Sequence, residues 1–286
     1  MKVLIIRNLK LFFRDRSAVF FSLLAVLIII ALYAVFLGDV WLDDSMEQIA
    51  NAKVLMNSWL TAGLLAVASV TTTMGAFSIM INDQVGKINK DFYSSPIKRS
   101  GVAGGYIGSA FLIGVIISVI AFAATEIYTV IIGGDWPDFI TCVKVFGLML
   151  FATVTNTSMV CFIVSFIKSQ SAYTALSTIT GTLIGFLTGI YLPIGSLPDS
   201  VQTIIKVFPV SHAAALFRQA LMEAPMRSAF EGIPSVYQEG FMEYMGIIFK
   251  FGDYKVSPAM SMLVLIITSV AFYGLSLINF RRRKFD

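Results

Sequence analysis

Six long apolar runs constrain this chain more than any other feature of its sequence. A helix needs about 20 apolar residues to cross the hydrocarbon core of a bilayer. Hydrophobic residues make up 57% of the chain and charged residues only 13%, a balance that does not describe a soluble domain with one core. We therefore predict an all-α integral membrane protein, with six transmembrane helices in a single domain over residues 1–286. The runs are 18–37, 59–81, 102–132, 143–167, 172–192 and 259–280.

Lysine and arginine placement orients the predicted bundle. Six spans bring four basic segments to one side of the membrane, and acidic residues dominate the two short loops opposite. We therefore predict a multi-pass plasma-membrane protein with both termini in the cytoplasm, and we attribute the net charge of +4 to this bias rather than to nucleic-acid binding. The basic residues are Lys2, Arg7, Lys10, Arg14 and Arg16; Lys87, Lys90, Lys98 and Arg99; Lys168; and Arg281, Arg282, Arg283 and Lys284. The acidic loop residues are Asp39, Asp43, Asp44, Glu47, Asp135 and Asp138.

The first residues, 3–16, are predicted to form a helix that lies in the inner membrane interface. The apolar run behind them is too long for a signal peptide and no small-x-small cleavage pattern follows it, so we expect it to stay as the first span. Apolar side chains share one face of the predicted helix and basic side chains another: Ile5, Ile6, Leu9, Phe12 and Phe13 against Arg7, Lys10 and Arg14.

A charged island, NDQVGKINKDFYSSPIKRSG at 82–101, separates the second and third runs. Val85, Ile88 and Phe92 recur at the spacing of one helical face, and charged residues occupy the other faces. This indicates a short amphipathic helix that stops near Ser94 and Pro96. Two interpretations stay open from the local pattern: a surface on which a soluble partner pushes, or a loop anchored among lipid headgroups.

The chain lacks the residues needed to hydrolyse ATP. Gly86-Lys87 is its one Gly-Lys pair, but Ile88 replaces the Ser or Thr of a phosphate loop and Ile81 replaces its first Gly. His212 is the only histidine, and no CxxC pair occurs, so neither motif pattern of a metal site is present. We expect a chain without catalytic residues, metal or bound cofactor. Any ATP-driven function would need another subunit.

The order and spacing of three segments resemble the type-2 ABC-transporter permease family. They are RNLKLFFRDR before the first span, DQVGKINKDFYSSPIKRSGVAGGYI after the second, and GIYLPIGSLPDSVQTIIKVFPVSH after the fifth. The last is similar to the family's external re-entrant segment. The chain departs from the family pattern at Asp83, where Glu is usual, and at Lys87-Ile88, where Gly-Thr-type sequences are common.

This resemblance implies a homodimer or pseudo-dimer of permeases in the bilayer, with two ABC ATPase subunits that bind ATP and Mg²⁺ beneath it. Residues 83–93 would be the coupling helix that transmits ATPase closure, with the N-terminal helix beside it. The contact residues implied are Asp83, Val85, Gly86, Ile88, Phe92 and Tyr93.

Small and hydroxylated residues of the second and fifth runs are candidates for a pathway or a dimer interface. Gly181, Gly185 and Gly189 repeat every four residues, which allows a neighbouring backbone to approach, either within one subunit or, as the resemblance favours, between subunits. The hydroxylated candidates are Thr71, Thr72 and Ser177. Two interpretations stay open: their hydroxyls line a substrate route, or they bond only to the backbone of their own helices. Glu126 is a separate case, because a carboxylate inside a span requires a polar partner or a cavity.

The external segment, 193–258, is punctuated by prolines and is too long for a simple turn. We expect short re-entrant helices at 201–208 and 212–222, followed by an aromatic stripe around Tyr237 and Tyr244 that lies on the outer leaflet or covers the dimer.

The sequence thus predicts the permease subunit of an ATP-driven exporter that moves an amphiphilic or hydrophobic substrate, such as a drug, antimicrobial peptide, lipid or glycan, by alternating access. Two alternatives stay open. An ion-coupled carrier or channel would need paired intramembrane charges, and only Glu126 is available. An intramembrane enzyme would need a catalytic constellation, for which Ser211-His212 is the only hint.

Overall fold

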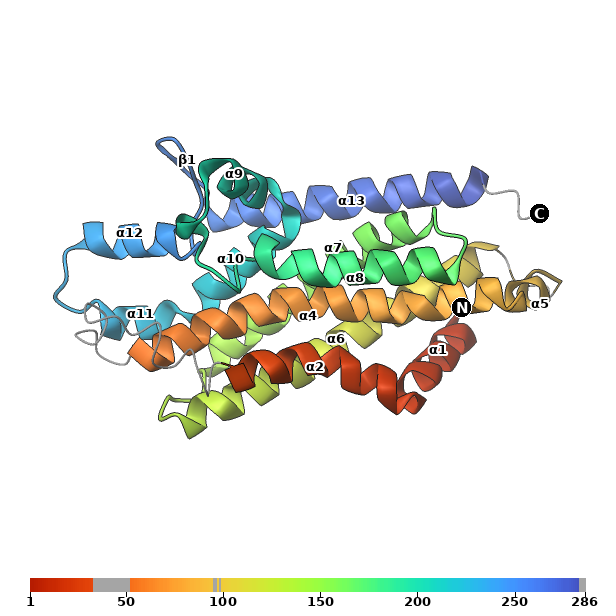
Figure 1. The fold of residues 1–286 in the computed structure, drawn as a ribbon, viewed down its shortest axis with the longest axis horizontal. Helices are drawn as coiled ribbons and strands as arrows, with labels where there is room; N and C mark the ends of the chain where they lie inside the picture. The colour runs from red at the N-terminus through yellow and green to blue at the C-terminus, as the bar shows by residue number, and fades with distance from the viewer. Residues whose placement is uncertain (33–51, 95–96, 98, 283–286) are drawn as a thin grey trace.

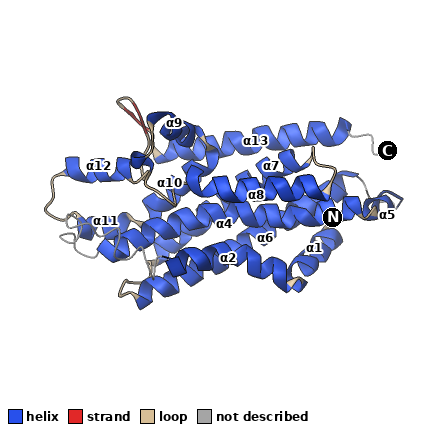
Figure 2. Cartoon of the chain, viewed as in Figure 1, coloured by secondary structure: helices blue, strands red, loops and turns tan. Residues whose placement is uncertain are grey.

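The computed structural model describes residues 1–286 apart from 33–51, 95–96, 98 and 283–286 (Figure 1). Helices form nearly all of the described chain, and a short hairpin is the one sheet found there (Figure 2). The helices are α1 (Lys2–Arg14), α2 (Arg16–Leu32), α4 (Ala52–Val85), α5 (Ile88–Ser94), α6 (Arg99–Ile131), α7 (Phe139–Val164), α8 (Gln170–Leu187), η2 (Ile194–Ser196), α9 (Asp199–Val207), α10 (Pro209–Leu221), α11 (Glu223–Ala229), α12 (Ser235–Tyr244) and α13 (Pro258–Arg282). The hairpin pairs β1 (Lys250–Phe251) with β2 (Tyr254–Lys255) in antiparallel fashion.

Helix α4 forms the centre of the bundle and runs along most of its length (Figure 1). Small residues such as Ala62, Ala66 and Ala68 alternate with larger ones, so neighbouring helices approach it closely. It packs against α6, α7, α8 and α10, and both Trp59 and Phe77 are buried. The molecule therefore has a helix rather than a layer at its core.

Figure 1 places α5 at one end of the bundle, with the start of α1, the end of α13 and the connection between α7 and α8. Helices α11 and α12 lie at the opposite end. We call these the α5 end and the α12 end. Lys87, Lys90 and Lys168 lie at the α5 end, as expected if the basic segments share one side of a membrane. The acidic loop over 39–47 lies outside the described residues.

Within the described residues, four helices are long and apolar enough to cross a membrane: α4, α6, α7 and α13. The pair α9 and α10, bent by 85°, would make a fifth if it counts as one broken span. Helix α2 covers only 16–32 of the first predicted run, and the rest of that run is outside the described residues. Helix α8, which contains several Ser and Thr residues, is not among these four helices. The count of six spans stays a prediction.

The fifth predicted run, 172–192, is wrong at its far end. Helix α8 ends at Leu187, and Gly189 follows with φ +64°, a left-handed conformation that favours glycine. The chain then turns, so that the buried side chains of Ile190 and Ile194 pack inside the molecule instead of extending the helix. The two short helices predicted here form as α9 and α10, one or two residues from the expected bounds at most ends and three at the start of α10, and their re-entry into the membrane stays a prediction.

Helix α1 ends at Arg14, and extended Asp15 separates it from α2. It packs against α6, where a Cβ on Gly105 would lie 2.5 Å from Leu4 Cδ2. Its inner face also carries buried Asn8, whose Nδ2 donates to Ser109 Oγ at 3.1 Å. The predicted separation of apolar and basic residues onto two faces of this helix is therefore wrong in part. Ile6 and Phe13 are exposed, whereas Arg7 turns inward, because a buried acid on α4 attracts it.

Candidate functional site

A partly buried ion pair lies at the α5 end, where α1 crosses α4. Asp83, in the last turn of α4, is only 3% exposed. The Arg7 guanidinium binds both of its carboxylate oxygens, with distances of 2.6 Å for Nη1–Oδ2 and 2.8 Å for Nη2–Oδ1. These hydrogen bonds raise the pKa of Arg7 above its ordinary value. A carboxylate removed from water needs such a partner, since an unpaired buried charge is strongly destabilising.

Helices α5 and α6 join the same cluster. The Tyr106 hydroxyl on α6 lies 2.6 Å from Asp83 Oδ2, to which it donates, and 3.2 Å from Asn89 Oδ1 on α5. The Arg7 guanidinium carbon stands 5.3 Å from the centroid of the Phe92 ring, also on α5, in a cation–π contact. We call Arg7, Asp83, Tyr106, Asn89 and Phe92 the Arg7–Asp83 cluster. It connects α1, α4, α5 and α6.

The single helix predicted over 83–93 is wrong in its bounds. Helix α4 continues through Asp83 to Val85, and α5 begins only at Ile88. Between them Lys87 adopts φ +59°, a left-handed conformation that breaks the helix. The Gly86 amide donates to Asn82 O at 2.8 Å and closes the turn. The apolar spacing did not indicate this break because it records only faces, not backbone angles.

The break also separates the apolar side chains that were predicted to share one face. Val85 is 51% exposed and Ile88 is 38% exposed, whereas Phe92 is half-buried under Arg7. The side chain of Tyr93 lies outside the described residues. Val85 and Ile88 therefore form the apolar surface that remains open on α4 and α5 at this end.

The three glycines of α8 and its end differ in their surroundings. A Cβ on Gly185 would lie 2.2 Å from the Tyr191 ring, and one on Gly189 would lie 2.7 Å from Ile194 Cγ1. These two serve packing within the chain. Nothing lies within 4 Å of a Cβ on Gly181, which leaves this position open to a partner. The glycines of this repeat therefore differ in role: Gly185 and Gly189 allow packing within the chain, and Gly181 is open to a partner.

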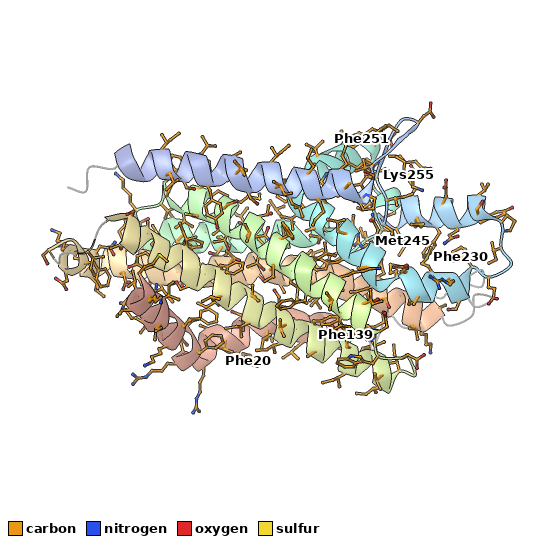
Figure 3. The ribbon with its side chains drawn as sticks, turned by 180° about the vertical axis from the view of Figure 1, so that it is seen from behind. Phe20, Phe139, Phe230, Met245, Phe251 and Lys255 are labelled. Carbon is orange, nitrogen blue, oxygen red and sulfur yellow. The ribbon has the colours of Figure 1, made fainter. Side chains whose placement is uncertain are left out.

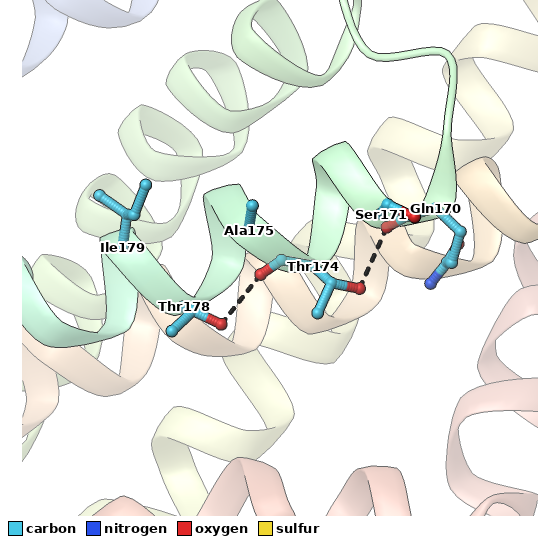
Figure 4. A pocket seen from close by; sticks show the side chains of 6 residues that line it. All are labelled: Gln170, Ser171, Thr174, Ala175, Thr178 and Ile179. Carbon is cyan, nitrogen blue, oxygen red and sulfur yellow. Dashed lines mark hydrogen bonds between the residues drawn. The ribbon is translucent and has the colours of Figure 1, made fainter.

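Hydroxyls form a ladder along the exposed side of α8 (Figure 4). Thr174 donates to Gln170 O and Thr178 donates to Thr174 O, each at 3.0 Å. Together with Ser171 they line an open groove, while Ser177 is half-buried. A hydroxyl already bonded to its own backbone still accepts a hydrogen bond, so this side can meet either polar groups or lipid.

On α4, the two candidate threonines differ in their surroundings. Thr72 is fully buried and its Oγ1 has no hydrogen-bond partner. Thr71 is half-buried and donates to Val67 O at 3.1 Å. The central position of α4 encloses Thr72, and a role for Thr71 or Thr72 at a pathway or dimer interface stays a prediction.

An apolar cavity of about 180 Å³ lies on the inner side of α8, between α4, α7 and α10. Its lining includes Met74, Leu183 and Phe208, and Asn156 and Thr180 are its polar residues. The Asn156 amide donates to Ser69 Oγ at 2.7 Å, which fixes the side chain across the gap between α7 and α4.

Glu126 is buried in α6, at 4% exposure. Its carboxyl contacts Thr129, whose hydroxyl receives a 2.6 Å hydrogen bond from Asn57 Nδ2 of α4. Glu126 therefore belongs to a polar contact between α6 and α4.

The α12 end contains a buried arginine that the sequence analysis did not identify. Arg218 of α10 is fully buried and stacks 4.7 Å from the centroid of the Trp59 ring. Its guanidinium donates to the carbonyls of Thr188 at 2.9 Å, Gly189 at 3.1 Å and Gly246 at 3.3 Å. We call this arrangement the Arg218 clasp. It joins α4, α10 and the ends of α8 and α12.

Trp59 reinforces the clasp, since its Nε1 donates to the carbonyl of Met245, labelled in Figure 3, at 2.8 Å. Nearby, Ser211 and His212 point to different partners. The Ser211 hydroxyl donates to Leu187 O at 2.6 Å, and His212 Nδ1 lies 3.1 Å from Ser261 Oγ. They do not form the nucleophile and base pair that an enzyme would need.

Comparison with known proteins gives the family. The family model described as ABC-2 type transporter matches residues 1–222. That region covers the Arg7–Asp83 cluster, α8 and the Arg218 clasp up to α10. None of the curated proteins compared with the chain matches it. The match spans more than half of the chain and agrees with its long apolar helices, so this multi-pass membrane protein belongs to the ABC-2 type transporter family.

Proposed function

We propose that the chain is the permease subunit of an ATP-driven exporter, with the α5 end in the cytoplasm and ABC ATPase subunits docked on it. The observation that supports this most is the exposed apolar surface of Val85 and Ile88, beside a short helix that only a turn joins to the central helix. Basic residues around it would face the cytoplasm under the positive-inside rule.

A second copy of the chain would complete the transporter. Gly181, open to its surroundings, and the hydroxyl ladder of Thr174 and Thr178 lie on the exposed side of α8. A hydroxylated face with room for close approach suits another helix or a polar route better than continuous lipid contact. The apolar cavity behind α8 supports a substrate that is amphiphilic or hydrophobic.

The experiment is affinity purification of the tagged chain from its native membrane in mild detergent. The variant Val85→Asp/Ile88→Asp should lose an ATPase that the wild type retains, because charge replaces the apolar docking surface. Phe92 stays unchanged, since it packs under Arg7.

The matched control is Val201→Asp/Ile204→Asp. It makes the same change at exposed apolar residues of α9, near the opposite end. It should retain the ATPase. No ATPase with the wild type, or equal retention by both variants, would contradict the proposed docking surface.

A further inference from the structure

The described polar and cation–π contacts of α5 converge on the Arg7–Asp83 cluster, and Phe92 also packs against the buried apolar residues beside it. Helix α5 has only seven residues, too short to be stable alone. Its link to α4 passes through Gly86 and Lys87, and the described side-chain contacts of α5 with the bundle include Asn89 to Tyr106 and Phe92 to Arg7. Both contacts lead to residues that bind Asp83.

Arg7 occupies a special position in this arrangement. The edge of its guanidinium holds Asp83 at two oxygens, and its face lies over Phe92. A planar guanidinium can serve an edge and a face at the same time, whereas a lysine ammonium cannot. Arg7 is also fixed from behind, because its Nη1 donates to Asn8 Oδ1 at 3.0 Å and Asn8 in turn binds α6.

We propose that Arg7 is the positioning residue that makes α1 and α5 move as one unit, so that a push on α5 displaces α1 and α6 and not only the turn at Gly86. The role in transport rests on the proposed function, but the mechanical link between the two helices does not. In this role Arg7 converts a hinged helix into part of a rigid body.

A distance measurement tests the link without any knowledge of the substrate. Spin labels replace exposed Lys10 on α1 and exposed Lys90 on α5, in a chain with Cys142→Ser and Cys161→Ala. Pulsed electron resonance then gives the distance distribution in lipid nanodiscs. With Arg7 present the distribution should be narrow. In Arg7→Met it should broaden at least twofold, because Asp83 and Phe92 lose their shared partner.

Arg14→Met is the matched control, since Arg14 is a basic residue of the same helix with an exposed side chain. It should leave the distribution narrow. The exchange Arg7→Asp with Asp83→Arg restores the ion pair and should recover part of the narrowing. A distribution for Arg7→Met as narrow as that of the control would overturn the proposal, provided that both variants elute as folded protein.

The ATPase complex separates this inference from the proposed function. With ATP and vanadate, wild type should keep the α1–α5 distance, and Arg7→Met should show a nucleotide-dependent shift together with at least a tenfold loss of permease-dependent stimulation of ATP hydrolysis. If nucleotide changes nothing in any variant while Arg7→Met still broadens the distribution, the docking proposal fails and the mechanical link stands. A wild-type distance that shifts as much as the variant's would refute the link itself.

Discussion

Replacing Arg218 by Met tests the clasp at the α12 end. Met matches much of the side-chain volume but removes three hydrogen bonds to carbonyls and the contact with Trp59. Among the described residues, no backbone amide donates to the carbonyls of Thr188, Gly189 or Gly246. The variant therefore leaves buried acceptors without donors.

The magnitude follows from opposing contributions. Three orphaned carbonyls at about 1–2 kcal/mol each, with about 1 kcal/mol for the lost cation–π contact, destabilise the variant. Wild-type Arg218 is a buried charge with no carboxylate partner among the contacts described, and burying it costs stability. Removing this charge offsets the loss by roughly 2–3 kcal/mol. The net loss is about 1–5 kcal/mol, centred near 3 kcal/mol, which corresponds to roughly 6–12 °C in melting temperature at the centre of that range.

The assay is thermal unfolding of the detergent-purified protein, followed by size-exclusion fluorescence. Arg218→Lys should melt no higher than Arg218→Met, because it keeps the buried charge but loses the fork that reaches several carbonyls. Arg227→Met, at a highly exposed arginine of the same end, serves as control. A wild-type melting temperature for Arg218→Met, or for Arg218→Lys, would refute the view that the carbonyl fork stabilises this end.

Two further predictions concern α8 and the start of α7. Gly185→Ala should lower the melting temperature by several degrees, because the added Cβ would overlap the Tyr191 ring. Gly181→Ala should leave the melting temperature unchanged, because nothing lies within 4 Å of its Cβ. Equal melting temperatures for the two variants would contradict the different roles assigned to these glycines. Asp138 caps α7 by accepting a hydrogen bond from the Thr141 amide, and hydrogen bonding at Thr141 lowers the pKa of Asp138. The contribution of Asp138 to stability is therefore present above its unfolded pKa and is lost as pH falls through its folded pKa. Acid should then lower the melting temperature of the wild type more than that of Asp138→Asn. Parallel pH profiles of the two melting temperatures would argue against the cap.

Hydropathy and charge predicted the class of this protein because the bilayer imposes length and apolarity on each span. Hydropathy is a weaker guide for α8, because its threonines reduce its apolarity. Hydropathy also did not indicate that the chain turns inward at Gly189. A left-handed conformation concerns the backbone angles of a single residue. Periodicity, which averages over several turns, does not detect it.

The candidate site shows a similar limit. Asp83 and Phe92 were identified from the charged island, but their partner Arg7 lies 76 residues from Asp83 in the sequence. Helical spacing assigned Arg7 to the basic face of its helix, since a pattern on one helix carries no information about an acid on another. Arg218 was missed for the same reason. A single arginine in a short helix does not indicate a buried contact, and only the tertiary structure places Trp59 beside it.

Trp59 and Asp83 lie on the same unbroken helix, α4. With a rise of 1.5 Å per residue, the two positions are roughly 36 Å apart along the axis. Each contacts an arginine from another helix, Arg218 at Trp59 and Arg7 at Asp83. If α4 tilted by about 10° around Trp59, Asp83 would sweep roughly 6 Å, which shows how a stiff helix of this rise and length turns a small rotation into a large displacement. Because Trp59 and Asp83 share one helix, a rotation of α4 would change the surroundings of both residues together.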